Sequence, residues 1–316
     1  MPRSTEKQII NDTNKLSQLL NLKPISRASL SITNNFPLRV TYSFATKIEK
    51  NNIKDPLLLQ VLPQKIEENE FSGYSQDPLQ EKKYSSIPGI IHKYPSKILL
   101  LTTKACLINC RFCFRRYANN FIQDWEKVFV YISKNTAINE AILSGGDPLI
   151  LSNQKLRTII TKLSAINNLK HLRIHTRIPI VYPKRITSNL IKTLIGSRFK
   201  PVIVMHCNHP NEIDRNTINA VKLFQKEGIS LYNQSVLLKG INADAEILIT
   251  LSEKLFACGI QPYYIHLLDK VMGAQHFHVE TKVAKKILHQ MTLKLPGYLI
   301  PKLVYENPDS LTKIFI

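Results

Sequence analysis

The chain has 316 residues, 44% of them hydrophobic, and its 43 Lys and Arg outnumber its 23 Asp and Glu to give a formal net charge of +20. This length and hydrophobic content exclude a small disulfide-stapled module and favour one large α/β domain with an extra segment. The charge raises the question of nucleic-acid binding. The lysines are dispersed, however, and form no basic stripe interleaved with aromatic residues, so no specific nucleic-acid partner is expected.

Targeting and redox signals point to the cytoplasm. No apolar run reaches membrane-spanning length, so no membrane partner is expected. The first ten residues contain no apolar segment of the kind that secretory signals carry. The five cysteines are an odd number without a paired framework, which argues against a disulfide scaffold.

Residues 1–90 are expected to form a helical and irregular lead-in, because prolines interrupt short apolar stretches there. After that, short β-rich runs alternate with longer segments of helical period. Asn211 and Asp244 stand where two of the helices would be capped. The expected strands are residues 98–103, 140–146, 171–177, 201–208, 230–238 and 261–269, and the expected helices lie near 122–135, 153–166, 186–196, 211–227, 244–257 and 278–294.

Six strand–helix units in alternation predict a parallel sheet, either an open doubly wound sheet or a curved partial barrel. In both architectures ligands gather at the carboxyl ends of the strands. Polar side chains stand at or near these ends, which makes them site candidates. They are Ser144, Asp147, His175, Arg177, His206, His209, Gln234 and Asp269.

Three cysteines follow the first predicted strand with the spacing C-x3-C-x2-C: Cys106, Cys110 and Cys113. Three thiolates on one short loop can hold three corners of an iron–sulfur cube. The fourth iron then keeps an open position, which a catalytic site needs. This pattern is typical of radical S-adenosylmethionine enzymes. A three-cysteine zinc site is the alternative, and Cys207 and Cys258 stand alone.

Ser144, Gly145, Gly146 and Asp147 follow the second predicted strand. Two glycines let the backbone approach a ligand closely, and free N–H and carbonyl groups can hold the polar end of an amino acid. A tight strand-to-helix turn would use the same residues. One βα unit after the cysteine loop, the motif resembles the one that holds the amino group of S-adenosylmethionine in radical enzymes.

Basic residues flank the first predicted strand. Arg115 lies two residues after Cys113 and offers a planar fork for a substrate carboxylate, with a solvated surface charge as the alternative. Lys93 and Lys97 enclose Tyr94 and could clamp a phosphate, although an ordinary basic loop is nearly as consistent.

Two later strand ends carry further candidates. His206 is expected to hydrogen-bond a cofactor, with a packed strand-end histidine as the alternative. A buried carboxylate without a partner is costly, so a cationic substrate would suit Asp269, which could otherwise cap a helix.

Together these motifs resemble the lysine 2,3-aminomutase family, and within it the subgroup that serves elongation factor P. Such a long ordered set of shared phrases is more specific than the cysteine motif alone. Besides the cysteine loop, the phrases are residues 36–40, 55–58, 60–63, 88–89, 92–94, 143–149, 172–177, 206–212, 233–238, 262–264, 269–273, 276–277 and 297–303.

The resemblance implies a partial (β/α)6 barrel that holds a [4Fe–4S] cluster, S-adenosylmethionine and pyridoxal 5′-phosphate. It implies migration of the α-amino group of L-lysine to the β carbon. The product would pass to a partner ligase that attaches it to a lysine of elongation factor P. The rivals are a free-standing catabolic aminomutase and a cluster-bearing nucleic-acid-binding protein, and a homo-oligomer stays open.

The resemblance also assigns roles by position. The run from Glu306 to Lys313 lacks the glycines that relatives carry there, so the alternatives for Lys313 are a pyridoxal held non-covalently and a decaying gene whose last element no longer works. The expected segments are an extension over 1–93, the barrel over 94–277, and a C-terminal helix with the pyridoxal lysine over 278–316. The implied roles are cluster ligands for Cys106, Cys110 and Cys113; carboxylate binding for Arg115; ammonium binding for Asp269 and Glu306; pyridoxal attachment for Lys313; phosphate binding for Lys93 and Lys97; and cofactor contacts for Ser144, Gly145, Gly146, Asp147, His206 and Gln234.

Overall fold

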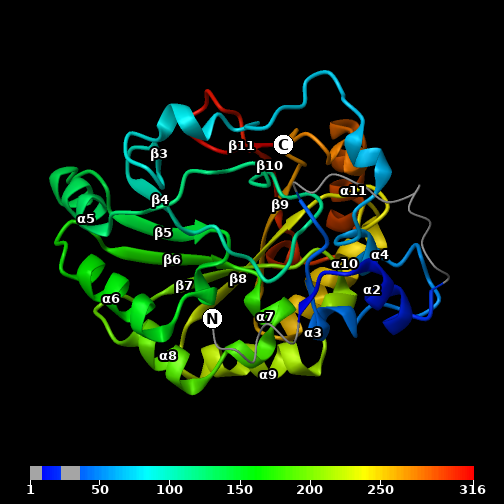
Figure 1. The fold of residues 1–316 in the computed structure, drawn as a ribbon, viewed down its shortest axis with the longest axis horizontal. Helices are drawn as coiled ribbons and strands as arrows, with labels where there is room; N and C mark the ends of the chain where they lie inside the picture. The colour runs from blue at the N-terminus through cyan, green and yellow to red at the C-terminus, as the bar shows by residue number, and fades with distance from the viewer. Residues whose placement is uncertain (1–8, 23–35) are drawn as a thin grey trace.

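A curved sheet of nine strands organises the molecule, with helices on its outer side (Figure 1). The structure is a computed structural model that describes residues 9–22 and 36–316. Residues 1–8, which make up most of the N-terminal stretch where no secretory signal is expected, therefore lie outside the described residues. No helix of the described chain has the length and apolar character needed to cross a membrane.

Six consecutive strands run parallel and form the barrel wall, as expected for a partial (β/α)6 barrel. Three further strands extend it. The antiparallel strand β3 (Ile90–Tyr94) precedes the wall, and β10 (Lys302–Tyr305) and β11 (Ile314–Phe315) follow it. The wall consists of β4 (Lys97–Thr103), β5 (Glu140–Gly145), β6 (His171–Thr176), β7 (Val202–His206), β8 (Ser230–Val236) and β9 (Gln261–His266).

The sheet crosses both of the expected segment boundaries. The boundary at residue 93 falls inside β3, and the segment after 277 contributes β10 and β11 to the same sheet. The edge strands β3 and β11 were not anticipated from the sequence. The lead-in and the C-terminal segment therefore add edge strands to the sheet that forms the barrel wall.

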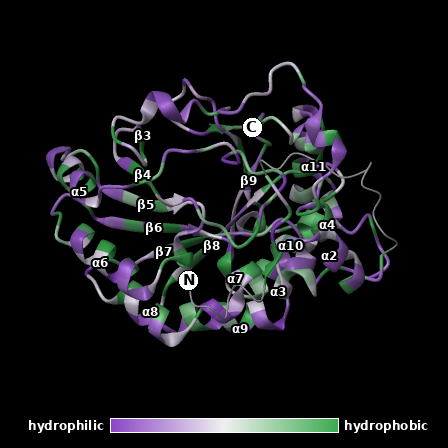
Figure 2. Cartoon of the chain, in the orientation of Figure 1, coloured by the Kyte–Doolittle hydropathy of each residue, from purple (hydrophilic) through white to green (hydrophobic). Residues whose placement is uncertain are grey.

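The six expected helices follow their strands and carry both hydrophobic and hydrophilic residues, as amphipathic helices do (Figure 2). Asp244 caps α10, as predicted. The cap expected at Asn211 is wrong, because Asn211 lies within a short 3-10 turn and Asp214 caps α9 instead. The helices are α5 (Trp125–Lys134), α6 (Asn153–Ser164), α8 (Ser188–Ile195), α9 (Arg215–Lys226), α10 (Ala245–Ala257) and α11 (Thr281–Thr292).

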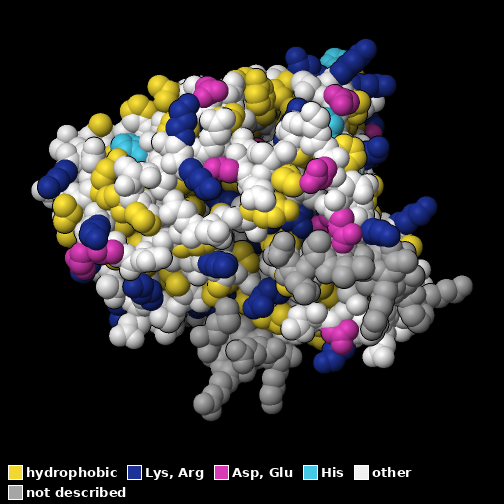
Figure 3. All heavy atoms as spheres, turned by 45° about the horizontal axis from the view of Figure 1, so that its top comes forward, with side chains coloured by type: hydrophobic (Ala, Val, Ile, Leu, Met, Phe, Trp, Pro, Cys, Tyr) yellow, Lys and Arg dark blue, Asp and Glu magenta, His cyan; other side chains and the backbone are white. Residues whose placement is uncertain are grey.

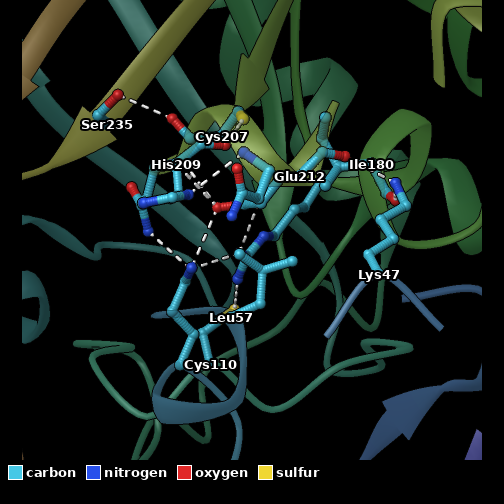
Figure 4. Close-up of polar contacts among 12 residues, drawn as sticks. Lys47, Leu57, Cys110, Ile180, Cys207, His209, Glu212 and Ser235 are labelled. Carbon is cyan, nitrogen blue, oxygen red and sulfur yellow. Dashed lines mark hydrogen bonds and ion pairs between the residues drawn. The ribbon is translucent and has the colours of Figure 1, made fainter. Parts of the chain in front are cut away.

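The described part of the lead-in contains short helices, two short strands and irregular segments. Its buried Lys47 fastens it to the barrel, because the Nζ atom donates hydrogen bonds to the carbonyls of Ile180 at 2.9 Å and Glu212 at 2.7 Å (Figure 4). The lead-in comprises β1 (Ile9–Ile10), α2 (Thr13–Leu19), β2 (Val40–Thr41), α3 (Tyr42–Ala45), α4 (Pro56–Leu59), η2 (Lys65–Glu68) and η3 (Glu81–Tyr84).

The two faces of the strands have different roles. On β6, Leu172 and Ile174 are buried in the hydrophobic core, while Arg173 and His175 line a cavity on the opposite face. The register continues this division around the wall, since His206 pairs with Gln234 and Gln234 with Tyr264. All of these pairs place polar side chains on the cavity side.

Candidate active site

One cavity of about 680 Å³ brings the predicted site residues together. A volume of this order is typical of small-molecule and cofactor sites. The residues come from β3 and the start of β4, from the segment after β4, from the carboxyl ends of later wall strands and the loops that follow them, and from the C-terminal segment. The lining includes Lys93, Lys97, Cys106, Cys110, Cys113, Arg115, Ser144, Gly145, Gly146, Asp147, His206, Gln234, Asp269, Glu306 and Lys313.

The three cysteines lie on the loop that follows β4 and face this cavity. The backbone of Arg39 helps to hold the loop, and its Nε donates to the carbonyl of Cys106 at 2.8 Å. Burial, followed by the thiol of Cys110, raises the pKa of Cys113 to about 11. A free thiol there is therefore protonated, and metal binding would remove the proton.

The donor set suits a cluster. No three His, Cys, Asp or Glu side chains of the described residues converge on a single metal ion. A [4Fe–4S] cube places each thiolate on a different iron and does not require that convergence. Three thiols on one loop, all facing a cavity, fit a cube whose fourth iron is open to a ligand.

Gly145 and Gly146 allow the second strand end to pack against the cysteine loop. Gly145 has φ +108°, and a Cβ on Gly146 would lie 2.2 Å from the carbonyl oxygen of Ala105. The N–H of Gly146 donates to Thr103, and the N–H of Asp147 to Ala105. The expectation that these N–H groups are free for a ligand is therefore wrong, because the cysteine loop uses them.

Asp147 is also satisfied within the protein. Its carboxylate accepts from Thr176 Oγ1 at 2.7 Å, from the Arg177 N–H at 2.7 Å and from the Leu149 N–H at 3.0 Å. Burial raises its pKa to about 6 despite these bonds. Ser144 contacts Arg115 through its hydroxyl, at 3.4 Å from Nη1.

Arg115 is held by an acid that the sequence did not single out. Its Nη2 lies 2.5 Å from Glu81 Oε1, and its Nε lies 3.0 Å from Glu81 Oε2. Glu81 belongs to η3 in the lead-in and also lines the cavity. One edge of the guanidinium is thus occupied, while the one hydrogen bond that Nη1 makes within residues 9–22 and 36–316 is its long contact with Ser144.

A second charged cluster surrounds Glu306. Its carboxylate pairs with Lys313 and accepts a hydrogen bond from the Tyr94 hydroxyl at 2.8 Å, and Lys93 lies 3.6 Å away. Burial acts in the opposite direction, but Lys313 and Tyr94 hold the pKa of Glu306 below its usual value. Lys97 lies over the Tyr94 ring at 4.9 Å. The structure thus brings four of the predicted residues together around Tyr94.

Asp269 differs from the other acids of the cavity. No ion pair or hydrogen bond to its carboxylate is found among the described residues. Burial, followed by repulsion from Glu306, raises its pKa to about 7. An unpaired acid in a cavity is suited to a cationic ligand.

Three histidines on separate strands face the cavity with unpartnered nitrogens. The Nε2 atoms of His175, His206 and His266 are buried and have no hydrogen-bond partner in the described structure. His206 stacks on Phe112 at 5.4 Å, and burial followed by Arg177 lowers its pKa to about 3. These neutral rings can donate to or accept from a ligand.

Besides Glu81, two further cavity residues, His266 and Arg173, are not among the predicted site residues. His266 follows Tyr264 by two positions, and this alternation on β9 could have identified it. Arg173 lines the cavity and is paired with Glu140, at 2.9 Å from Nε to Oε1. Arg173 stands two residues before His175 on β6, and this alternation could have identified it as well.

Comparisons with known proteins come from sequence and from structure. No protein-family model matches the chain. A protein named L-lysine 2,3-aminomutase from Buchnera aphidicola subsp. Baizongia pistaciae is 45% identical, covering 97% of this chain and 92% of the relative. Proteins of the same name from Haemophilus influenzae and Escherichia coli are 44% and 41% identical, covering 95% and 94% of this chain and 90% and 89% of the relatives.

A solved structure shares the fold. The crystal structure of Streptococcus suis SuiB bound to S-adenosylmethionine aligns with a TM-score of 0.50 and 15% identity. The alignment covers 90% of this chain and 73% of that chain.

Proposed function

Because the chain belongs to the lysine 2,3-aminomutase family of radical S-adenosylmethionine enzymes, we propose that it converts L-lysine to β-lysine by moving the α-amino group to the β carbon. The observation that carries this proposal is that three cysteines, Arg115, Asp269 and Lys313 all line one cavity of about 680 Å³.

Each cavity residue receives a role from its chemistry. Cys106, Cys110 and Cys113 hold a [4Fe–4S] cluster. Arg115 binds the lysine carboxylate through the donors that Glu81 leaves available, and Asp269 binds the side-chain ammonium. These two charges fix lysine at both ends and so set which carbon faces the radical source.

The C-terminal cluster serves pyridoxal phosphate. Lys313 is the attachment residue, and Glu306 holds its amino group in the cavity until the cofactor binds. Lys97 and Lys93 supply positive charge for the phosphate. When bound, the cluster and S-adenosylmethionine supply an organic radical, and pyridoxal phosphate carries the amino group during migration.

The remaining assignments concern the groups that would hold S-adenosylmethionine. His206 and Gln234 are adjacent in the sheet and offer hydrogen-bonding groups to S-adenosylmethionine. In the turn after β5, the carbonyls of Gly145 and Gly146 are assigned to the amino group of S-adenosylmethionine. The N–H groups of Gly146 and Asp147 are left out of this assignment because the cysteine loop accepts them.

The test is anaerobic turnover. The protein is reconstituted with iron and sulfide and supplied with S-adenosylmethionine, pyridoxal phosphate, a low-potential reductant and L-lysine. We expect β-lysine from the wild type and none from Cys110→Ala, while Cys258→Ala remains active. A wild-type protein that holds the cluster and both cofactors but forms no β-lysine would overturn the proposal.

The destination of the product is the finer part of the proposal. We assign it to the ligase that modifies a lysine of elongation factor P, on the basis of the subgroup motifs in the sequence. A free-standing aminomutase would use the same cavity. Deletion of the gene should remove the β-lysyl modification from elongation factor P, as seen by mass spectrometry, and an unchanged modification would favour the free-standing enzyme.

A further inference from the structure

Arg177, at the carboxyl end of β6, contacts a cysteine sulfur directly. Its Nη1 donates to Cys110 Sγ at 2.8 Å. The side chain is only 6% exposed, so water does not weaken this contact. A charged donor at this distance from a thiolate forms a strong, charge-assisted hydrogen bond.

A buried network fixes the direction of this guanidinium. Its Nη2 donates to Gln60 Oε1 at 2.6 Å and to Glu212 Oε2 at 2.9 Å. Figure 4 shows Glu212 and Cys110 within this network. The two terminal nitrogens of Arg177 therefore have different partners: Nη2 contacts Glu212 and Gln60, and Nη1 contacts the sulfur of Cys110.

Several hydrogen bonds hold the Glu212 carboxylate in one position. It is fully buried and accepts from the N–H groups of Asn208 at 2.9 Å and His209 at 3.1 Å, and from Gln60 Nε2 at 3.1 Å. Burial opposes ionisation, yet Arg177 and these donors hold its pKa below the usual value. The carboxylate stays charged and keeps Arg177 in place.

Arg177 also holds more donors than the chain satisfies. Its Nε is buried and has no partner within the described residues. A purely structural arginine of this burial would be expected to place all its donors on protein acceptors. The guanidinium therefore carries a buried donor beyond those that contact the sulfur, the acid and the amide.

We infer that Arg177 is a positioning residue that raises the reduction potential of the [4Fe–4S] cluster through its hydrogen bond to Cys110. The inference rests on the cluster assignment of the proposed function. When a low-potential donor gives the cluster one electron, the cluster becomes more negative. An N–H donor and a positive charge stabilise that reduced state more than the oxidised one.

The test is a redox titration of the reconstituted holoenzyme, followed by electron paramagnetic resonance. Arg177→Gln removes the charge and shortens the donor. We expect one-electron reduction to become about tenfold less favourable, which is a fall of about 59 mV for a one-electron couple. Arg177→Lys should fall between this variant and the wild type, because it keeps the charge but loses the fork.

The matched control is Arg198→Gln. The Arg198 guanidinium donates to the carbonyls of Ser164, Ile166 and Leu169. These carbonyls lie at the end of α6 and in the loop that leads to β6, away from the cysteine loop. Its loss should leave the potential unchanged. Arg177→Gln protein with full iron content and the wild-type potential would overturn the inference while leaving the proposed function intact.

A second measurement covers a variant that fails to hold iron. Protein that keeps Arg177 is labelled with guanidino-¹⁵N arginine, and it carries Arg39→Lys to remove the arginine that donates to the Cys106 carbonyl. Pulsed paramagnetic resonance of the reduced cluster should show a ¹⁵N coupling. Absence of the coupling would overturn the inference, whereas a wild-type protein without iron would overturn the proposed function itself.

Discussion

Asp269 is the cavity acid whose charge depends most on pH near neutrality. Its pKa is raised to about 7, first by burial and then by Glu306. As the pH falls through this value the carboxyl gains a proton and loses the charge that attracts the lysine ammonium. Lysine affinity should therefore fall on acidification, by about tenfold between roughly pH 8 and pH 6, because only the ionised fraction binds.

The pH dependence of lysine affinity, measured for wild type and for Asp269→Asn, checks this. The variant should bind lysine more weakly at high pH, by roughly 1.5–3 kcal/mol, since it lacks the charge-assisted contact. It should also lose the acid limb of the profile. An acid limb that persists unchanged in Asp269→Asn would assign the titration to another group.

Lys313 is expected to carry pyridoxal, and its pairing with Glu306 places its amino group on the cavity wall. Borohydride reduction of pyridoxal-loaded protein should label the peptide that contains Lys313. Lys313→Ala should abolish the label and leave the iron content unchanged, because the cysteines lie on a separate segment. Peptide mass spectrometry reads the label, and Lys302→Ala is the control for a nearby exposed lysine. Label on Lys302, or on no lysine, would contradict the assignment.

At the scale of elements, the close approach between the β5 turn and the cysteine loop is the most demanding contact. A Cβ on Gly146 would meet the Ala105 carbonyl oxygen at 2.2 Å, so Gly146→Ala must displace one of the two backbones. We expect this variant to lose most of its cluster. Gly297→Ala is the control, because nothing lies within 4 Å of a Cβ there. Iron and sulfide analysis decides, and a full cluster in Gly146→Ala would show that the approach is not needed.

The start of α10 gives a prediction about stability. Asp244 accepts from the N–H groups of Glu246 at 2.9 Å and Ile247 at 3.2 Å. Asp244→Ala should lower the free energy of unfolding by about 1 kcal/mol, whereas Asp244→Asn should cost less because it keeps the acceptor. Denaturant titration of the protein measures both. Equal free energies of unfolding for the two variants would show that the Asp244 side chain does not stabilise the start of α10.

Local patterns in the sequence predicted most of the wall, and contacts between distant segments explain what was missed. The alternation on β6 and the apolar run of β4 identify strands directly. The pairing of Glu81 with Arg115 joins an irregular lead-in to the cysteine loop, and no local pattern reports it. The cap at Asn211 failed because a 3-10 turn precedes α9.

At the scale of the whole molecule, the two ends of the open sheet are joined by side chains. Lys93, on β3, donates to the Asn307 carbonyl at 2.5 Å, and Tyr94 donates to Glu306. Tyr84 adds a bond to the Pro308 carbonyl at 2.6 Å. Figure 1 shows the red C-terminal segment beside the cyan segment that holds η3.

This arrangement places the pyridoxal lysine and Glu306 on a segment of the chain separate from the cysteine loop. A chain shortened to end at Tyr305 would keep β10 and the cysteine loop but lose Glu306, Lys313 and β11. It should retain iron and reductive cleavage of S-adenosylmethionine, but bind no pyridoxal covalently and form no β-lysine. Loss of the cluster on truncation would show that the C-terminal segment supports the whole barrel.

The surface adds little to specificity in this account. Lys and Arg side chains are scattered over the face shown in Figure 3 and are interspersed with acidic and hydrophobic ones. The selective chemistry is confined to the cavity. The basic side chains behind the +20 net charge therefore do not gather into one patch on that face.

The central claim is that this cavity moves the amino group of lysine from one carbon to the next within the same molecule. Turnover of L-lysine labelled with ¹⁵N at the α position and ¹³C at the β carbon tests it directly. The product should show a one-bond ¹³C–¹⁵N coupling by nuclear magnetic resonance, because the labelled nitrogen becomes bonded to the labelled carbon. Lysine that keeps its nitrogen on the α carbon after incubation with protein carrying its cluster and both cofactors would contradict the account.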